Sequence, residues 1–514
     1  MSKLVSMPRL QAIKLGPLFF WLGFSLLVIF SSLFFGLIAS TSSLILFALA
    51  AGLLIGLILL FNPAWDIWLL IVLGLTSTAM ISFAGPDLYS KLGWGLSLIG
   101  FLLWIPSFLV FYETKRLPLF IGLSFAFVVY AILATLVQWY SFGEFLAGFK
   151  RYFQAYGLMF ALAIIPFAAT RYKRWMTGLL VIGLLQLPLA LYERLILVPE
   201  RGGLASGSDS TDVVAGTFGA NLVGGSGNAE MATFLLIILA FLFSRWREKQ
   251  LSGATLVLIG ALIFAPLTLG ETKIVVFMLP LIAVILMKND LRDNPVRFLM
   301  IGSVFAVLVA ALGYVYVTLI MRETLYEAVH SLILYNFENV GYGTNVLNRT
   351  SVLTFWWQQQ GFSDPVGFFL GHGLGSAYTP ATTQLPGHLS LEYPQYGIDL
   401  TAASTLLWDL GLVGFLFYLS ILAAAWLAAR KLYKTSTNPR TRADALAIQA
   451  SVTLFLPYVF YRNTPVNFLS WEIVIALVLG YLGHLMRGTY PAKNNPKRST
   501  GPIPLQGVGP AHQS

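Results

Sequence analysis

Apolar blocks about as long as a bilayer is thick recur along almost the whole sequence. A helix needs roughly 20 consecutive apolar residues to cross the hydrocarbon core, and blocks near that length predict about fourteen helical spans. They lie near 17–39, 43–62, 65–84, 92–112, 117–137, 153–170, 175–194, 229–244, 253–270, 273–287, 298–320, 404–429, 445–461 and 467–486. The sequence therefore predicts an all-α, polytopic membrane helix bundle with a large extracytoplasmic loop.

Charged side chains are too scarce for a water-soluble protein. They make up 11% of the 514 residues, and 57% of the residues are hydrophobic. Soluble domains carry about 25% charged residues, so most of these side chains must face lipid. A transmembrane β-barrel is excluded, because its strands would show short alternating segments. The first block is followed at once by others, and we expect a retained span rather than a cleaved signal peptide.

Lys and Arg collect on one side of the predicted spans. Twenty-three of the 32 basic residues precede the first span, follow the last one, or occupy alternate loops. Such an excess marks the cytoplasmic side, so we predict a multi-pass protein with both termini in the cytoplasm. The net charge of +10 is then mainly a topology signal, and we expect no nucleic-acid partner.

A single transmembrane domain is predicted for 1–486, followed by a disordered cytoplasmic tail at 487–514. Two outer loops, 195–228 and 321–403, are long, and long loops in compact bundles usually carry function. The segment 138–152 spaces aromatic residues as a helix lying in the membrane interface would, although an aromatic belt at a span end is an equal alternative. The chain has no cysteine, which excludes disulfides and thiolate chemistry.

The first outer loop is rich in Gly, Ser and Asp and should be irregular. Its carboxylates Asp209 and Asp212 are isolated in a Ser/Gly run, so we expect them to be solvated and predict no metal and no cofactor. The loop ends with Gly-Thr-Phe-Gly at 216–219 and Gly-Asn-Ala-Glu at 227–230. Glu230 is a candidate for either a catalytic or a buried structural role.

The second outer loop should contain helical pieces at 322–335 and 349–360. Its aromatic residues, among them Trp356 and Trp357, would pack on the membrane surface or stack on sugar rings. Its Gly-His-Gly-Leu-Gly-Ser run at 371–376 would let backbone N–H groups approach a ligand. The outer turn at 269–273 adds Glu271 and Lys273, and ionisable residues near a membrane are functional candidates, although Lys273 could also simply snorkel.

The order of these motifs resembles the O-antigen ligase and polymerase superfamily. The resemblance is clearest over 216–419 and includes Leu-Gly-Leu-Val-Gly at 410–414. It implies a transferase whose donor is a glycan on undecaprenyl pyrophosphate and whose acceptor is lipid A core or another lipid-linked repeat. It also implies a bacterial inner membrane with periplasmic loops. Membrane lipids and polysaccharide export or chain-length proteins are the further partners to expect.

The family pattern places an Arg in the outer turn, where this chain has Lys273, and another in the large loop, which Arg349 matches. It often places a His-Asn pair just before the Leu-Gly-Leu-Val-Gly span. This chain has Asp-Leu-Thr-Ala-Ala-Ser at 399–404 instead, and His388 lies upstream as a candidate substitute. The departure favours a polymerase-like member.

Departure of a pyrophosphate leaving group builds up negative charge, which fixed cations can stabilise without a metal, while the acceptor hydroxyl needs a base. The candidate catalytic residues are Lys273, Arg349, His388, His372 and Asp399. The candidate substrate-binding residues are Arg322, Arg201, Glu271, Glu230, Asn228, Trp356 and Trp357. Glu230 is also a candidate base.

The alternative function is a secondary transporter or a flippase for lipid-linked sugars. A transporter should show internal repeats and mid-span breaks or charges. We find no convincing repeat, and the mid-span segments are almost free of charge, so the enzyme is favoured. A structural scaffold is disfavoured by the cation-rich outer loops. The sugar, the linkage, and the choice between polymerase and ligase stay open.

Overall fold

The computed structural model describes residues 62–80, 86–111, 117–202, 208–222, 226–293, 345–380 and 385–487, with scattered positions between 295 and 341. The chain divides into the units Met1–Asp66 and Ile67–Ser514, and nearly all described residues belong to the second. The described residues are 79% helical and contain no strand. The predicted all-α class is therefore confirmed for this part of the chain.

Seven helices in the described residues are long and apolar enough to cross a membrane. They are Leu92–Phe111 (α5 and α6, Pro86–Leu102 and Trp104–Phe111), α7 (Leu119–Val137), Ala169–Glu200 (α10, Ala169–Tyr192, and α11, Val198–Glu200), α12 (Asn228–Arg247), α20 (Ala402–Thr435), α21 (Pro439–Tyr461) and α22 (Leu469–Arg487). Each coincides with a predicted span. The chain is a helical membrane protein.

Three shorter apolar helices, α3 (Pro63–Thr76), α13 (Gly253–Leu269) and α14 (Val275–Asp293), coincide with three further predicted spans. The predicted span 153–170 contains α9 (Tyr156–Ile164), which has only nine residues. The predicted spans 17–39 and 43–62 (except residue 62), and most of 298–320, lie outside the described residues. The total of about fourteen spans stays a prediction.

Close approach of small residues holds the centre of the second unit together. Helix α20 packs on α21 and α7, while α22 packs on α9. A Cβ added at Gly480 of α22 would lie 2.7 Å from Cβ of Leu162, and one at Gly483 would lie 2.5 Å from Cβ of Ala163. Glycines of this kind let helix backbones approach closely where no aqueous driving force joins them.

Ion pairs join the helix ends into two separate groups. Where α12 ends and α21 begins, Arg245 Nε lies 2.9 Å from Asp444 Oδ1. Where α12 begins and α21 ends, Arg462 Nη1 lies 3.2 Å from Glu230 Oε2. The first group carries the segments rich in Lys and Arg, and we call it the basic end. Helices α12 and α21 therefore run antiparallel, and the side of the membrane on which each end lies stays a prediction.

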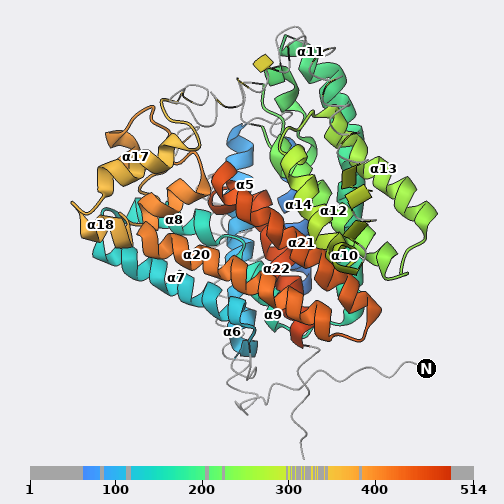
Figure 1. Cartoon of the computed structure of the whole chain (residues 1–514). Coiled ribbons are helices and arrows are strands. Elements are labelled where there is room, and N and C mark those ends of the chain that lie inside the picture. The colour runs from blue at the N-terminus through green and yellow to red at the C-terminus, as the bar shows by residue number, and fades with distance from the viewer. Residues whose placement is uncertain are drawn as a thin grey trace, which may run out of the picture. The chain divides into compact units, whose positions relative to one another are not determined.

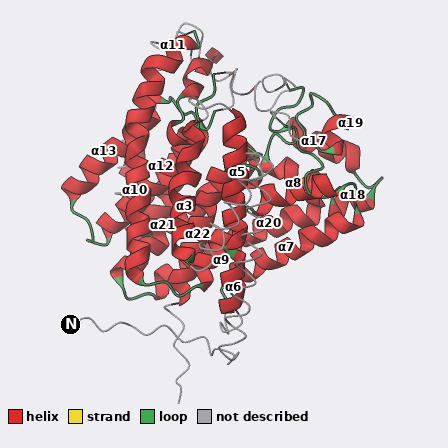
Figure 2. Ribbon diagram, turned by 180° about the vertical axis from the view of Figure 1, so that it is seen from behind, coloured by secondary structure: helices red, strands yellow, loops and turns green. Residues whose placement is uncertain are grey.

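Short helices from distant parts of the chain gather beside α7 and α20. They are α8 (Phe142–Phe153), α17 (Ser351–Gln360), α18 (Pro365–Leu370) and α19 (His388–Glu392). Figures 1 and 2 show α8, α17 and α18 together beside these two long helices. Helix α8 covers most of the segment 138–152, whose place in a membrane interface stays a prediction, and α17 coincides with the predicted helical piece at 349–360. These short helices position the candidate site.

Candidate functional site

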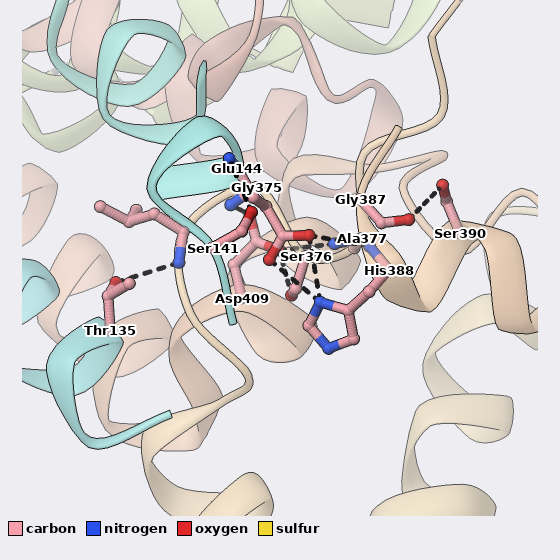
Figure 3. A network of polar contacts seen from close by, with 11 residues as sticks. Thr135, Ser141, Glu144, Gly375, Ser376, Ala377, Gly387, His388, Ser390 and Asp409 are labelled. Atoms are coloured by element: carbon pink, nitrogen blue, oxygen red, sulfur yellow. Dashed lines mark hydrogen bonds and ion pairs between the residues drawn. The ribbon is translucent and has the colours of Figure 1, made fainter. Parts of the chain in front are cut away.

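A buried carboxylate in α20 organises the Gly-rich loop. Asp409 is 1% exposed. Its Oδ1 accepts hydrogen bonds from the backbone N–H of Ala377 at 2.9 Å and from Ser376 Oγ at 2.8 Å. Its Oδ2 accepts from the N–H of Gly375 at 3.1 Å and from the hydroxyl of Tyr152 at 3.0 Å. Figure 3 shows Asp409 beside these loop residues. Four donors compensate the burial of one carboxylate, which fixes the loop on the helix.

A break in α20 supplies further partners for the same loop. Gly411 has φ 67° and ψ −173°, which interrupts the helical hydrogen bonding. The carbonyls of Trp408 and Asp409 instead accept hydrogen bonds from the N–H groups of His372 and Gly373, both at 2.9 Å. The N–H of Leu374 donates to Thr135 Oγ1 at 3.0 Å. The loop N–H groups that were expected to approach a ligand are thus bonded to the protein, and the glycines serve a structural turn.

The imidazole of His388 is paired with a carboxylate from α8. Its Nδ1 lies 3.0 Å from Oε1 and 3.1 Å from Oε2 of Glu144. The backbone N–H of His388 donates to the same carboxylate at 2.9 Å, and the Tyr140 ring stacks on the imidazole with 4.3 Å between centroids. Figure 3 shows the pair at the start of α19. A carboxylate on Nδ1 holds the proton there and makes Nε2 the basic nitrogen.

A buried cation lies further along α8, beside the loop that follows the Gly-rich run. Arg151 of α8 is 7% exposed, and its guanidinium carbon lies 2.9 Å from the centroid of the Tyr378 ring. It interacts electrostatically with Asp399 and Asp409. Asp399 accepts a hydrogen bond from the N–H of Thr379 at 3.0 Å. Burial raises the pKa of Asp399 to about 6, so this carboxyl group titrates near neutral pH.

His372 lies close to His388 and is partly buried. The centroids of the two imidazoles are 6.4 Å apart. Nε2 of His372 lies 3.0 Å from Oε1 of Gln360. Burial lowers the pKa of His372, which favours the neutral imidazole. Of the predicted candidate bases, His388, His372 and Asp399 are therefore attached to one loop, whereas Glu230 is engaged elsewhere.

A second cluster, which we call the arginine cluster, lies where α21 ends. Nε of Arg349 donates to the carbonyl of Tyr461 at 2.9 Å, and its guanidinium carbon lies 4.3 Å from the centroid of that ring. The next residue, Arg462, donates to the carbonyl of Ser226 at 2.8 Å and pairs with Glu230, which is 1% exposed. The structure thus gives Glu230 the buried ion-pair role.

The arginine cluster is joined through the backbone to the first cluster, which contains His388, Glu144, Arg151, Asp399 and Asp409. The N–H of Ala402 donates to the carbonyl of Arg462 at 2.9 Å, so α20 begins beside the arginine cluster. Helix α8, which carries Glu144 and Arg151, packs on the turn Thr464–Val466 that follows Arg462. The base candidates and the arginines therefore belong to one face of the bundle.

The predicted outer turn packs on the first outer loop. Asn228 Nδ2 donates to the carbonyl of Gly270 at 3.0 Å and to that of Val214 at 2.8 Å. Glu271 has φ 49° and pairs with Arg194 at 2.8 Å. The side chain of Lys273 is exposed. Asn228 and Glu271 thus hold the turn in place, and Lys273 projects from it.

The remaining predicted site residues are spread over several surroundings. Arg322 lies outside the described residues, and Arg201 occupies the turn after α11. Trp356 is 4% exposed and stacks on Phe368 at 5.1 Å, as a core residue does. Trp357 is 54% exposed and is available for contact with lipid or a sugar ring.

Four residues of the two clusters were missed from the sequence: Glu144, Arg151, Asp409 and Arg462. Asp409 carries a usable signal, since a carboxylate inside the predicted span 404–429 is a functional candidate by default. Arg462 carries a weaker one, because it lies in the predicted outer turn between the last two spans. Glu144 and Arg151 carry no separate signal, because charged residues are ordinary on the polar face of an amphipathic helix.

Within the described ranges, no group of three or more His, Cys, Asp or Glu side chains could hold a metal ion. Comparison with family models and with curated proteins gives no match to this chain.

Proposed function

We propose that this protein is a membrane glycosyltransferase that polymerises or ligates oligosaccharide repeats carried on undecaprenyl pyrophosphate. It acts at the outer face of a bacterial cytoplasmic membrane, in the synthesis of O-antigen, capsule or exopolysaccharide. The observation that carries the proposal is the His388–Glu144 pair, at 3.0 Å, on the same face as the arginine cluster. A base beside fixed cations is what glycosyl transfer from a pyrophosphate requires.

His388 is the general base of the proposed reaction. Its Nε2 takes the proton from an acceptor sugar hydroxyl, whose oxygen attacks the anomeric carbon of the donor glycan. The new glycosidic C–O bond forms as the anomeric C–O bond to phosphate breaks. Glu144 stabilises the imidazolium that results, as a carboxylate on Nδ1 does in other His-based catalysts.

Undecaprenyl pyrophosphate leaves with the bonding electrons and one additional negative charge. Arg349 supplies a guanidinium group suited to bidentate contact with phosphate, and Lys273 supplies a point charge. Because these cations are fixed in place beforehand, they stabilise the charge that develops in the transition state. The proposed chemistry therefore needs no metal ion.

The proposed orientation follows from the basic end. The basic end faces the cytoplasm, and the segments 345–401 and 462–468 face outward. The bundle has about fourteen spans, and both termini lie inside. Reporter fusions after Ser208 and Gly361 should read outside, and fusions after Lys249 and Thr437 should read inside. An inside signal at Gly361 would overturn both the orientation and the enzyme.

Deletion of the gene, followed by gel analysis of surface and lipid-linked glycans, tests the function. Loss of a polymerase leaves single repeats on lipid A or another acceptor, whereas loss of a ligase leaves long lipid-linked chains and none on the acceptor. Loss of a flippase leaves undecaprenyl-linked single repeats on the cytoplasmic side of the membrane. That third pattern, or an unchanged glycan, would contradict the proposal. The purified protein should also extend a lipid-linked donor in detergent, which a flippase cannot do.

A further inference from the structure

A cavity of about 180 Å³ lies between α10, α12 and α22, near the basic end of the bundle. Most of its wall is apolar and includes Leu180, Ile238, Leu477 and Val478. Apolar cavities of about 150 Å³ stay dry and bind small hydrophobic molecules. The cavity therefore offers room for part of an acyl chain and lies away from the candidate site, which occupies the other ends of α12 and α21.

Three cations from three helices line the same cavity. They are Lys173 of α10, Arg245 of α12 and Arg440 of α21. Arg245 is paired with Asp444 at 2.9 Å, so its charge is compensated. The side chains of Lys173 and Arg440 are exposed, and no Asp or Glu is among the described residues of the wall. The cavity thus carries an excess of positive charge.

Two polar donors of the cavity wall are buried without a hydrogen-bond partner. They are the indole Nε1–H of Trp175, a residue that is 3% exposed, and Nη2 of Arg245. Leaving a buried donor unsatisfied costs about 1–3 kcal/mol. Both residues line the cavity. Both atoms are closed off from a water-sized probe, so the case for a ligand depends on the apolar wall and on the exposed cations Lys173 and Arg440.

We propose that the cavity binds one anionic phospholipid. An acyl chain enters between α10, α12 and α22, and the phosphate lies against Lys173 and Arg440, which compensate its charge. Basic pockets between helices on the cytoplasmic side are suited to anionic head groups. A zwitterionic lipid offers the same phosphate, but its head-group cation would face Lys173 and Arg440. This inference is independent of the proposed enzymatic function.

Native mass spectrometry of the full chain, purified and stripped of lipid in detergent, tests the proposal. Phosphatidylglycerol and phosphatidylcholine with identical acyl chains are titrated in parallel. We expect one phosphatidylglycerol to bind with an affinity roughly tenfold or more above that of phosphatidylcholine, because two uncompensated cations favour the anionic lipid. Equal affinities, or binding of neither lipid because the chain itself fills the cavity, would overturn the proposal.

Variants separate the head-group contacts from the apolar cavity. The double substitution Lys173→Gln, Arg440→Gln should bring the two lipids to nearly equal affinity. Arg174→Gln is the matched control, because Arg174 is exposed on the same turn of α10 but does not line the cavity. Loss of the preference in this control would indicate general surface charge instead of a site.

A third variant, Val478→Phe, fills the cavity and should weaken both lipids. Unchanged binding by the Val478→Phe variant would place the lipid elsewhere. The charge variants test the site even if this variant does not fold, since Lys173 and Arg440 are exposed.

Discussion

Nδ1 of His388 lies 3.0 Å from Oε1 of Glu144, although 244 positions separate the two residues in the sequence. The same carboxylate accepts the backbone N–H of His388, so Glu144 fixes both the ring and the start of α19. If His388 is the base, His388→Ala should lower the rate of glycan extension about 10²–10⁴-fold. Glu144→Gln should cause a smaller loss, because an amide still accepts a hydrogen bond but stabilises the imidazolium less.

The matched control for this prediction is His330→Ala, since His330 is exposed and stacks on Tyr326 instead of joining the network. Extension of a purified lipid-linked donor, normalised to folded protein, is the measurement. Full activity in His388→Ala would remove this residue from the chemistry.

Arg349 should contribute to the stabilisation of the leaving pyrophosphate. Arg349→Ala should lower the rate on the order of 10²-fold, as does removal of other preorganised groups that stabilise developing charge. Arg349→Lys should recover only part of the activity, because the planar guanidinium that stacks on Tyr461 is lost. Lys273→Arg should be tolerated. Glycan length and membrane abundance are measured for all three variants.

A purely structural Arg349 would give a different result. Its contact with the carbonyl of Tyr461 would then matter only for folding, and Arg349→Ala would lower protein abundance with normal activity per molecule. Arg171→Ala, at an exposed cation of the basic end, controls for general charge loss.

Asp399 should make the stability of the protein depend on pH. Burial raises its pKa from 3.8 to about 6, so the folded state binds this proton more tightly than the unfolded chain does. The contribution of Asp399 to the free energy of unfolding therefore falls as pH rises from about 4 to about 6, and is constant above that range. Asp399→Asn should remove this dependence, a difference of roughly 1–3 kcal/mol.

Unfolding in detergent at pH 4.5 and pH 7 measures the effect. The control is Asp364→Asn, because Asp364 caps α18 and asparagine caps a helix equally well. If Asp399→Asn and the unsubstituted protein show the same change in stability between the two pH values, Asp399 is not the group responsible.

Gly411 should tolerate no side chain. Its φ of 67° and ψ of −173° lie in a region reserved for glycine, and an added Cβ would collide with the backbone of Phe369 and Gly371. Gly411→Ala should therefore destabilise the protein by about 1–3 kcal/mol or more. Gly122→Ala in α7, where an added Cβ meets nothing within 4 Å, should be neutral or slightly stabilising. Thermal unfolding compares the two, and equal melting temperatures would contradict the proposed break in α20.

Chelation should leave the activity unchanged. Arg349 and Lys273 can compensate the pyrophosphate charge in the proposed reaction without a metal ion. The purified enzyme should therefore retain its rate in EDTA. Loss of activity on chelation, with recovery on addition of Mg²⁺ or Mn²⁺, would show that these cations are insufficient.

Helix positions followed from the sequence because hydropathy is a local property. The predicted span 229–244 corresponds to Asn228–Arg247, and 253–270 corresponds to Gly253–Leu269. The break at Gly411 did not follow, since a glycine in an apolar run gives no sign of its φ. The expectation of almost charge-free spans also overlooked Asp409 and Glu472, which are both buried.

The candidate site was predicted only in part. Its loop residues His372, His388 and Asp399 were identified by residue type, and Arg349 by its place in a family-like order of motifs. Their partners could not be identified, because Glu144 and Tyr461 are brought to them by tertiary packing across more than one hundred positions. A lone Glu in an amphipathic helix has many equivalent explanations until its partner is known.

The bonds between Asp409 and the loop at 375–377 impose an order on biogenesis. The loop leaves the ribosome before Asp409 does, by roughly 2–7 s at ordinary rates of synthesis. During that interval the N–H groups of Gly375 and Ala377 lack their acceptor. The Gly-rich loop therefore stays without these hydrogen bonds until α20 has been synthesised. A ribosome that stalls after Asp399 and before Asp409 would leave a chain in which every catalytic candidate of the loop is synthesised but the loop is not yet bonded to α20.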